Sequence, residues 1–257
     1  MNTITDSSHK PDRKAFEEAK LKILGTQRQR LGIGTLAEKT VHAILKNYYE
    51  PREEKQEVPL AGYVADIFTG QEVIEIQTRQ LYKMKEKLSV FLALYPVTVV
   101  HPIPREKWLI WVDQDSGALT PRRKSPLKGS PYTAFTELYG IKMFLNQKNL
   151  RLRLALLDIE EYKLQNGQRK GRKKGAASYD RIPLEFVQEV TVDSREDYLQ
   201  FIPPDLADED FTSKDFAQAA RIKIPLAQTV LHVLYHVGAV DRVGKKGRLY
   251  LYRAMPR

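Results

Sequence analysis

The sequence predicts an α/β protein in which a mixed sheet is flanked by helices and followed by a small C-terminal domain. Two patterns support this prediction. In the N-terminal half, hydrophobic periodicity changes in the order helix, three strands, helix, strand. Near the C-terminus, two short helical segments precede two strands that are joined by a Gly-rich turn. We therefore expect a leader and helix over residues 1–30, an α/β domain over 31–204 and the small domain over 205–257.

Local signals define the elements of the N-terminal half. A short amphipathic helix is expected over residues 14–24. Thr35 has the character of an N-cap and Glu38 stands at the capping-box spacing, so a second helix should run from there to about Tyr49, before Pro51. The other predicted elements are strands at 55–59, 63–68 and 73–78, a helix at 80–94, and strands at 97–100 and 108–112.

The middle of the chain has weaker patterns. Residues 131–145 have helical character, while 151–159 and 182–192 read as strands. The region 119–204 as a whole could extend the sheet, form a clamp or make a dimer interface. Within it, residues 163–175 carry bases and no acid, which predicts a flexible loop that is either a solvated hairpin tip or a contact to a DNA backbone. Its cations are Lys163, Arg169, Lys170, Arg172, Lys173 and Lys174.

Composition narrows the class of protein. The absence of cysteine excludes a disulfide framework, thiolate zinc sites and cysteine nucleophiles, and it fits a reducing, cytoplasmic compartment. The apolar stretches are far shorter than the roughly 20 residues that a membrane span needs, so no membrane partner is expected. The formal net charge of +10 favours a polyanionic partner, of which nucleic acid is the commonest. Charge alone does not separate DNA from RNA, ribosome or anionic lipid.

The C-terminal segment has compact helix signals. Thr212 or Ser213 should cap a short helix, Pro225 suits the first position of a second helix, and Gly238 should end it. A hairpin is then expected around the turn at 244–247. This order of helix, turn, helix and hairpin resembles the winged-helix family over about 47 residues.

The resemblance to winged helices implies contacts with nucleic acid. Periodicity predicts that Gln228, Thr229 and His232 lie on the outer face of the second helix, where they would suit a major groove. A protein–protein role for the domain stays open. His232 and His236 have the i,i+4 spacing of metal ligands, but no Glu follows His232 and no third ligand is evident. The predicted phosphate contacts at the hairpin tip are Lys245, Lys246 and Arg248.

Two acids interrupt apolar strands in the N-terminal half. Strand alternation places Glu75 and Gln77 on one side of their strand, and Asp66 can lie beside Glu75 across the hairpin. A carboxylate pair in a sheet costs desolvation energy unless a cation or hydrogen-bond donors compensate it. Two hard oxygen ligands suit Mg2+ or Mn2+. The alternative is that both acids are half-exposed residues paired with Lys or Arg.

This arrangement resembles the PD-(D/E)xK superfamily of restriction enzymes, junction resolvases and repair nucleases over about residues 35–101. The resemblance implies that Asp66 and Glu75 bind the metal, that Gln77 positions water, and that Glu38 is an additional acid. Gln77 stands where the family usually has Lys. Either Lys83 or Lys87, on the following helix, could supply the missing cation.

The sequence therefore favours a restriction-endonuclease-like fold with a C-terminal winged helix, acting as a metal-dependent endonuclease on duplex DNA. A homodimer would provide two active sites for cutting both strands. The second hypothesis is a non-catalytic DNA-binding regulator, or a recombination or defence accessory protein, with a degenerate nuclease fold, which the Gln77 substitution favours. A third is an RNA-binding protein, for which the basic loop provides a contact surface.

Overall fold

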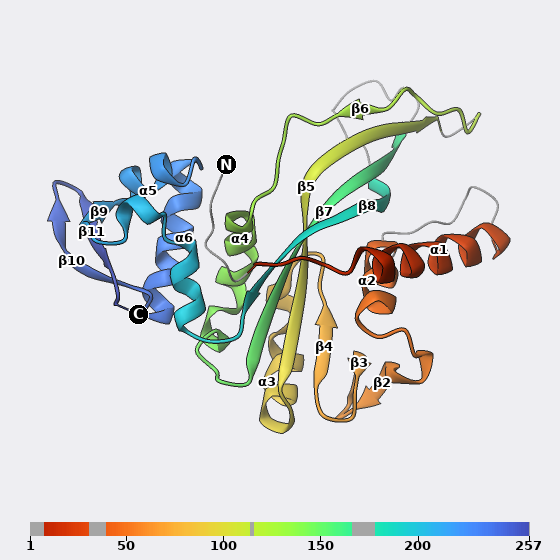
Figure 1. The fold of residues 1–257 in the computed structure, drawn as a ribbon, viewed down its shortest axis with the longest axis horizontal. Helices are drawn as coiled ribbons and strands as arrows, with labels where there is room; N and C mark the ends of the chain where they lie inside the picture. The colour runs from red at the N-terminus through yellow and green to blue at the C-terminus, as the bar shows by residue number, and fades with distance from the viewer. Residues whose placement is uncertain (1–7, 31–39, 114–115, 166–177, 257) are drawn as a thin grey trace, which may run out of the picture.

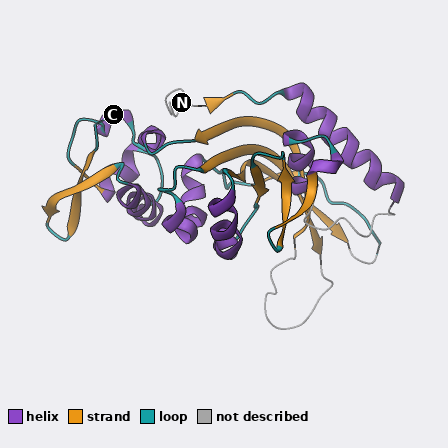
Figure 2. Cartoon of the chain, turned by 90° about the horizontal axis from the view of Figure 1, so that it is seen from below, coloured by secondary structure: helices purple, strands orange, loops and turns teal. Residues whose placement is uncertain are grey.

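The structure is a computed structural model that describes residues 8–30, 40–113, 116–165 and 178–256. A long, curved sheet runs through its centre, with helices on both faces (Figure 1). The C-terminal hairpin lies at one end of the molecule and the N-terminal helix at the other in both views (Figures 1 and 2). This arrangement confirms the predicted α/β class with a mixed sheet flanked by helices.

Two helices precede the sheet. α1 (Arg13–Arg30) is longer than the predicted helix at 14–24, and Asp12 caps it by accepting hydrogen bonds from the backbone N–H groups of Lys14 (2.9 Å) and Ala15 (3.1 Å). α2 (Thr40–Tyr49) ends where predicted, just before Pro51. The expected N-cap Thr35 and its capping-box partner Glu38 lie outside the described residues.

The three predicted strands are confirmed. They are β2 (Gln56–Leu60), β3 (Tyr63–Phe68) and β4 (Val73–Ile76), which is two residues shorter than expected. The 3-10 helix η1 (Glu53–Lys55) precedes β2. After β4, the 3-10 helix η2 (Leu81–Met84) is continued by α3 (Lys85–Leu94). The predicted helix at 80–94 therefore begins as a 3-10 turn.

The two strands predicted at 97–100 and 108–112 form one long strand, β5 (Val97–Asp113). The ladder with the neighbouring strand continues through Pro102 and Pro104 and shifts register only between Pro104 and Glu106. β7 (Leu150–Gln165) and β8 (Ser178–Val192) are also longer than predicted, so Lys163 belongs to a strand rather than to the basic loop.

The described sheet has eight strands. Its order is β1-β8-β7-β5-β4-β3-β2, where β1 is Ser8–His9, and β6 (Arg123–Lys124) pairs with β5. β5 runs parallel to β4 and to β7, and the other neighbours are antiparallel. The carboxyl end of β4 therefore lies in the interior of the sheet, beside Val100 near the start of β5.

One helix was predicted at 131–145, but this segment is three short pieces. They are η3 (Pro131–Ala134), α4 (Phe135–Leu138) and η4 (Tyr139–Phe144). The backbone of Ile141 leaves the helical region (φ −117°), and a Cβ on Gly140 would lie 3.0 Å from the Tyr82 side chain. The segment follows the surface of η2 instead of forming a straight helix.

Apolar side chains cover both faces of the sheet. α1 and α2 pack on one face, where Ile67, Ile76 and Val100 are buried with Phe16 and Ile44. On the other face, α3, α4 and the C-terminal elements form a second cluster. None of the described helices is long and apolar enough to cross a membrane.

The C-terminal elements follow the predicted order. Thr212 caps α5 (Ser213–Ala219), α6 (Ile224–Val237) has Pro225 in its first turn, and Gly238 ends it with a left-handed backbone (φ 74°). A hairpin of β10 (Val240–Lys246) and β11 (Leu249–Ala254) pairs with a short strand that was not predicted, β9 (Phe211–Thr212).

The boundary predicted at residues 204 and 205 falls in a short 3-10 helix. η5 (Glu196–Phe201) and η6 (Pro204–Leu206) connect β8 to β9. Pro203 is buried, and one apolar cluster extends from the sheet through α4 to α6. The C-terminal elements are therefore packed against the α/β part by a continuous core.

Candidate active site

β3 and β4 form a fork in the sheet, and the two predicted acids occupy it. The strands pair at Ile67↔Ile74 and Phe68↔Val73. At the next position, the Asp66 N–H donates to Glu75 Oε1 (3.2 Å), and the Ile76 N–H donates to Asp66 Oδ2 (2.8 Å). Carboxylate oxygens thus replace backbone carbonyls in the ladder. The predicted juxtaposition of Asp66 and Glu75 is present.

Each acid also contacts a cationic or titratable side chain from a helix. Lys87, from α3, places Nζ 2.5 Å from Glu75 Oε2. His42, from α2, places Nε2 3.1 Å from Asp66 Oδ2. Because α2 and α3 lie on opposite faces of the sheet, the fork receives one such group from each side. Of the two lysines considered from the sequence, Lys87 is the one at the site, and Lys83 is exposed.

The two acids have opposite pKa shifts. Glu75 is 3% exposed, and burial together with the Asp66 charge raises its pKa to about 7 despite the contact with Lys87. Burial also opposes ionisation of Asp66, but the hydrogen bond and charge of His42, the Ile76 N–H and Lys87 together lower the pKa of Asp66. The pair therefore holds one negative charge firmly and a second that exchanges with a proton near neutral pH.

Gln77 does not contact Glu75 in this structure. Its side-chain Nε2 donates to the carbonyl of Arg79 (2.5 Å), and its backbone N–H donates to the carbonyl of Val100 (2.9 Å). Its own carbonyl accepts from Nδ1 of His101 (2.8 Å). The cation beside Glu75 is thus Lys87, from the following helix, while the Gln77 side chain is held by the Arg79 carbonyl. Glu38 lies outside the described residues.

The two acids can supply part of the ligand set of Mg2+. Mg2+ is commonly held by one or two carboxylates, with water and substrate phosphate as the other ligands. Asp66 and Glu75 can supply those two carboxylates. Within the described part of the chain, no group of three or more His, Asp or Glu side chains has the geometry of a complete protein-made metal site. The site would therefore need oxygen ligands from water and phosphate.

The predicted phosphate contacts at the C-terminal hairpin are accessible. Lys245, Lys246 and Arg248 are exposed at or beside the turn between β10 and β11. On α6, Gln228 is exposed, whereas the Thr229 hydroxyl donates to the Pro225 carbonyl in the same helix (3.1 Å). The basic-loop residues Arg169, Lys170, Arg172, Lys173 and Lys174 lie outside the described residues.

His232, predicted to face outward toward a DNA groove, is half-buried and contacts a segment from earlier in the chain. Its ring lies 5.0 Å from the Tyr139 ring, and its Nε2 lies 2.8 Å from Lys142 Nζ. α6 packs against α4 and η4, and Val233 is buried. The helical periodicity indicated the buried stripe correctly, but it could not show that a distant segment covers part of the opposite side.

Sequence reasoning missed two features. The first is the contact of His42 with Asp66. The available signal was its spacing, because His42 stands four positions after Glu38 on the predicted helix. Arg242 lies with its guanidinium 4.4 Å from the Tyr235 ring centre and 4.0 Å from the Tyr250 ring centre. The alternation of aromatic residues in β11 could have indicated such a stack.

Comparisons with known proteins place the site in a family. The sequence model of the family described as "Domain of unknown function (DUF8091)" matches residues 39–193. The chain belongs to this family. The matched region contains His42, Asp66, Glu75 and Lys87, and it ends before α5 and α6.

One relative extends beyond that region. An uncharacterized protein of Treponema pallidum (strain Nichols) is 29% identical over 231 residues, which cover 87% of this chain and 88% of the relative. No solved structure matches the chain. The similarity to the Treponema protein thus includes residues outside the stretch that defines the DUF8091 domain.

Proposed function

We propose that this DUF8091 protein is a metal-dependent DNA endonuclease with a restriction-endonuclease-like core. The observation that carries the proposal is the fork at Asp66 and Glu75, where a half-buried and a buried carboxylate lie at the point at which two strands separate. A buried pair of acids is unfavourable by itself, as the raised pKa of Glu75 indicates. A divalent cation would compensate both charges.

In this proposal, Asp66 and Glu75 bind Mg2+ or Mn2+ through the lone pairs of their carboxylate oxygens that accept no hydrogen bond. The bound metal would polarise the scissile phosphate and lower the pKa of a coordinated water. Lys87 holds its ammonium beside Glu75, where it would stabilise negative charge on the attacking oxygen. His42 orients the Asp66 carboxylate by its contact to Oδ2. Gln77, held by the Arg79 carbonyl, would have to rotate to position water.

The C-terminal elements support binding to duplex DNA. Their order, β9-α5-α6-β10-β11, resembles that of a winged helix, and the hairpin tip presents Lys245, Lys246 and Arg248. Since α6 is partly covered by α4 and η4, we assign the main phosphate contact to the hairpin rather than to α6. The net charge of +10 would attract the DNA over a longer range.

Cleavage of supercoiled plasmid and of labelled linear DNA tests the proposal. The wild type should cut both in Mg2+ or Mn2+ and neither in EDTA. Glu75→Gln should lose at least about a hundredfold in rate, as expected when a ligand that stabilises the transition state is removed. Glu86→Gln is the matched control, because Glu86 is an exposed acid on α3, next to Lys87. Equal cutting by the wild type and Glu75→Gln would contradict the assignment.

A non-catalytic DNA-binding protein is the second candidate. The observation that favours it is that Lys87 and His42 already contact the two acids, while Gln77 is engaged by the Arg79 carbonyl. The same experiment separates the two functions. Salt-sensitive binding to duplex DNA without cutting in either metal would select this second candidate, and the degenerate site would then be a structural feature of the sheet.

A further inference from the structure

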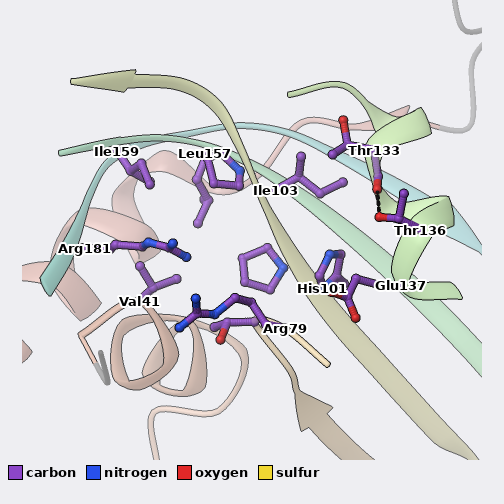
Figure 3. Close-up of a pocket in the computed structure, with 13 residues that line it drawn as sticks. Val41, Arg79, His101, Ile103, Thr133, Thr136, Glu137, Leu157, Ile159 and Arg181 are labelled. Atoms are coloured by element: carbon purple, nitrogen blue, oxygen red, sulfur yellow. Dashed lines mark hydrogen bonds between the residues drawn. The ribbon is translucent and has the colours of Figure 1, made fainter. Parts of the chain in front are cut away.

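A pocket of about 180 Å³ lies beside the fork, at the carboxyl end of β4 (Figure 3). α2, β5, β7, β8, η3 and α4 contribute to its lining. Two of its lining residues are close in sequence to the fork: Val41 precedes His42, and Thr78 follows Glu75 by three positions. The segments that carry the candidate active site therefore also line the pocket, although Asp66 and Glu75 themselves do not.

Arginine side chains provide positive charge at one side of the pocket. Figure 3 shows Arg79 and Arg181 on the same side and His101 on the other. Arg181 places Nη2 3.6 Å from Glu161 Oε1, while its Nε is buried with no hydrogen-bond partner among the described residues. A buried guanidinium N–H without an acceptor costs free energy. Guanidinium groups match phosphate geometry.

The opposite side offers an acceptor and an apolar wall. The Nδ1 of His101 lies 2.8 Å from the Gln77 carbonyl, so it must carry the proton, and the neutral ring then presents Nε2 as an acceptor. Burial lowers the pKa of His101, which keeps the ring neutral. Ile103, Leu157 and Ile159 form an apolar surface between the polar sides.

We propose that this pocket binds one unpaired nucleotide of the DNA strand, with its base against the apolar wall and its phosphate on Arg181. An exocyclic amino group of the base would donate to His101 Nε2. The volume suits one base, since an engineered cavity of about 150 Å³ accepts benzene. Unstacking a base costs a few kcal/mol, and least in single strands or at mismatches. This inference rests on the proposed nuclease function and adds a preference for distorted or single-stranded sites.

The test measures binding in EDTA, so that it does not depend on cutting. A single-stranded 12-mer carries one central 2-aminopurine, whose fluorescence rises when the base leaves the stack. The wild type should raise the fluorescence, and Asp66→Asn should do so equally. Arg181→Met should weaken binding of the 12-mer by about tenfold or more, the loss expected for a charge-assisted hydrogen bond. Arg123→Met, at an exposed arginine on β6, is the matched control for the lost charge.

A second variant distinguishes a blocked pocket from a misfolded protein. Thr136 is exposed on α4 at the pocket, so Thr136→Trp should block the pocket without entering the apolar core. It should abolish the fluorescence rise while leaving the midpoint of urea unfolding unchanged. Strand binding with no fluorescence rise in the wild type, or an unchanged rise in Thr136→Trp, would overturn the proposal.

Two further arms separate the sources of the ligand. Deoxycytidine 5′-monophosphate should compete with the 12-mer only at far higher concentration than an unlabelled strand. A mononucleotide that binds more tightly than the strand would overturn the proposal in favour of a free nucleotide ligand. Cutting of DNA without a fluorescence rise would refute the pocket and leave the nuclease intact, whereas a rise without cutting would support the pocket and refute the nuclease.

Discussion

Replacing Glu75 by Gln should stabilise the metal-free protein at alkaline pH. Glu75 is 3% exposed, and its pKa in the folded protein is about 7 against an ordinary value of 4.5. The carboxyl group therefore prefers its neutral form in the folded state. An amide has nearly the same shape as the neutral acid, and it keeps the Oε1 that accepts from the Asp66 N–H.

The magnitude follows from the pKa difference. At about 1.4 kcal/mol for each tenfold change in proton affinity, ionised Glu75 costs roughly 3 kcal/mol of folding free energy above pH 7. Since the pKa is raised on folding, stability is fully present below pH 4.5 and is lost as pH rises through about 7. The advantage of Glu75→Gln should thus approach 3 kcal/mol near pH 8.5 and fall to about 1 kcal/mol or less at pH 5.

Urea unfolding in EDTA at pH 5 and pH 8.5 measures this advantage. Glu86→Gln is the control, because an exposed acid on α3 should change the free energy of unfolding by less than about 0.5 kcal/mol at either pH. Excess Mg2+ should then stabilise the wild type, by about 1.4 kcal/mol at ten times the dissociation constant, and should not stabilise Glu75→Gln. A variant that is less stable than the wild type in EDTA at pH 8.5 would refute the reasoning.

Three other substitutions test the fold and the DNA contact. Arg105→Ala should cost on the order of 2 to 3 kcal/mol in urea unfolding, because it leaves buried Asp158 without its two-bond partner; a loss below 0.5 kcal/mol would contradict this. Thr212→Ala should cost about 1 kcal/mol through the lost cap of α5, and equal stability of the two proteins would argue against the capping box. Replacing Lys245 and Lys246 together by Ala should lower the slope of log affinity for duplex DNA against log salt by about 2; an unchanged slope would remove the hairpin from the interface.

Local periodicity was sufficient to predict most helices and strands of this fold. The acids at 66 and 75 were identified because they interrupt alternating apolar strands, and the structure places them together at the fork. Two separate strands were predicted where β5 is continuous through Pro102 and Pro104, although prolines normally interrupt a central ladder. Here the register shift beside Pro104 accommodates them.

The parts of the site that were missed depend on long-range packing. His42 reaches Asp66 only because α2 crosses the sheet at the fork. His232 contacts Tyr139, which lies 93 positions earlier in the chain and belongs to a segment that was expected to be one helix. Arg181 joins the pocket through the pairing of β8 with β7. Apart from the spacing of His42 after Glu38, these contacts have no signal within one local window of sequence.

The fork also determines how substitutions at this site should be read. Asp66 Oδ2 accepts a hydrogen bond from the Ile76 N–H. In a regular ladder this N–H would donate to a backbone carbonyl, so the carboxylate has a structural role in the sheet in addition to its role in the site. Asp66→Ala would leave that buried donor unsatisfied, at a cost of about 1 to 3 kcal/mol, and loss of activity in that variant would have two causes. Asp66→Asn keeps an oxygen for the Ile76 N–H and removes the charge. Only such isosteric changes separate the chemistry of the two acids from their part in holding β3 and β4 apart.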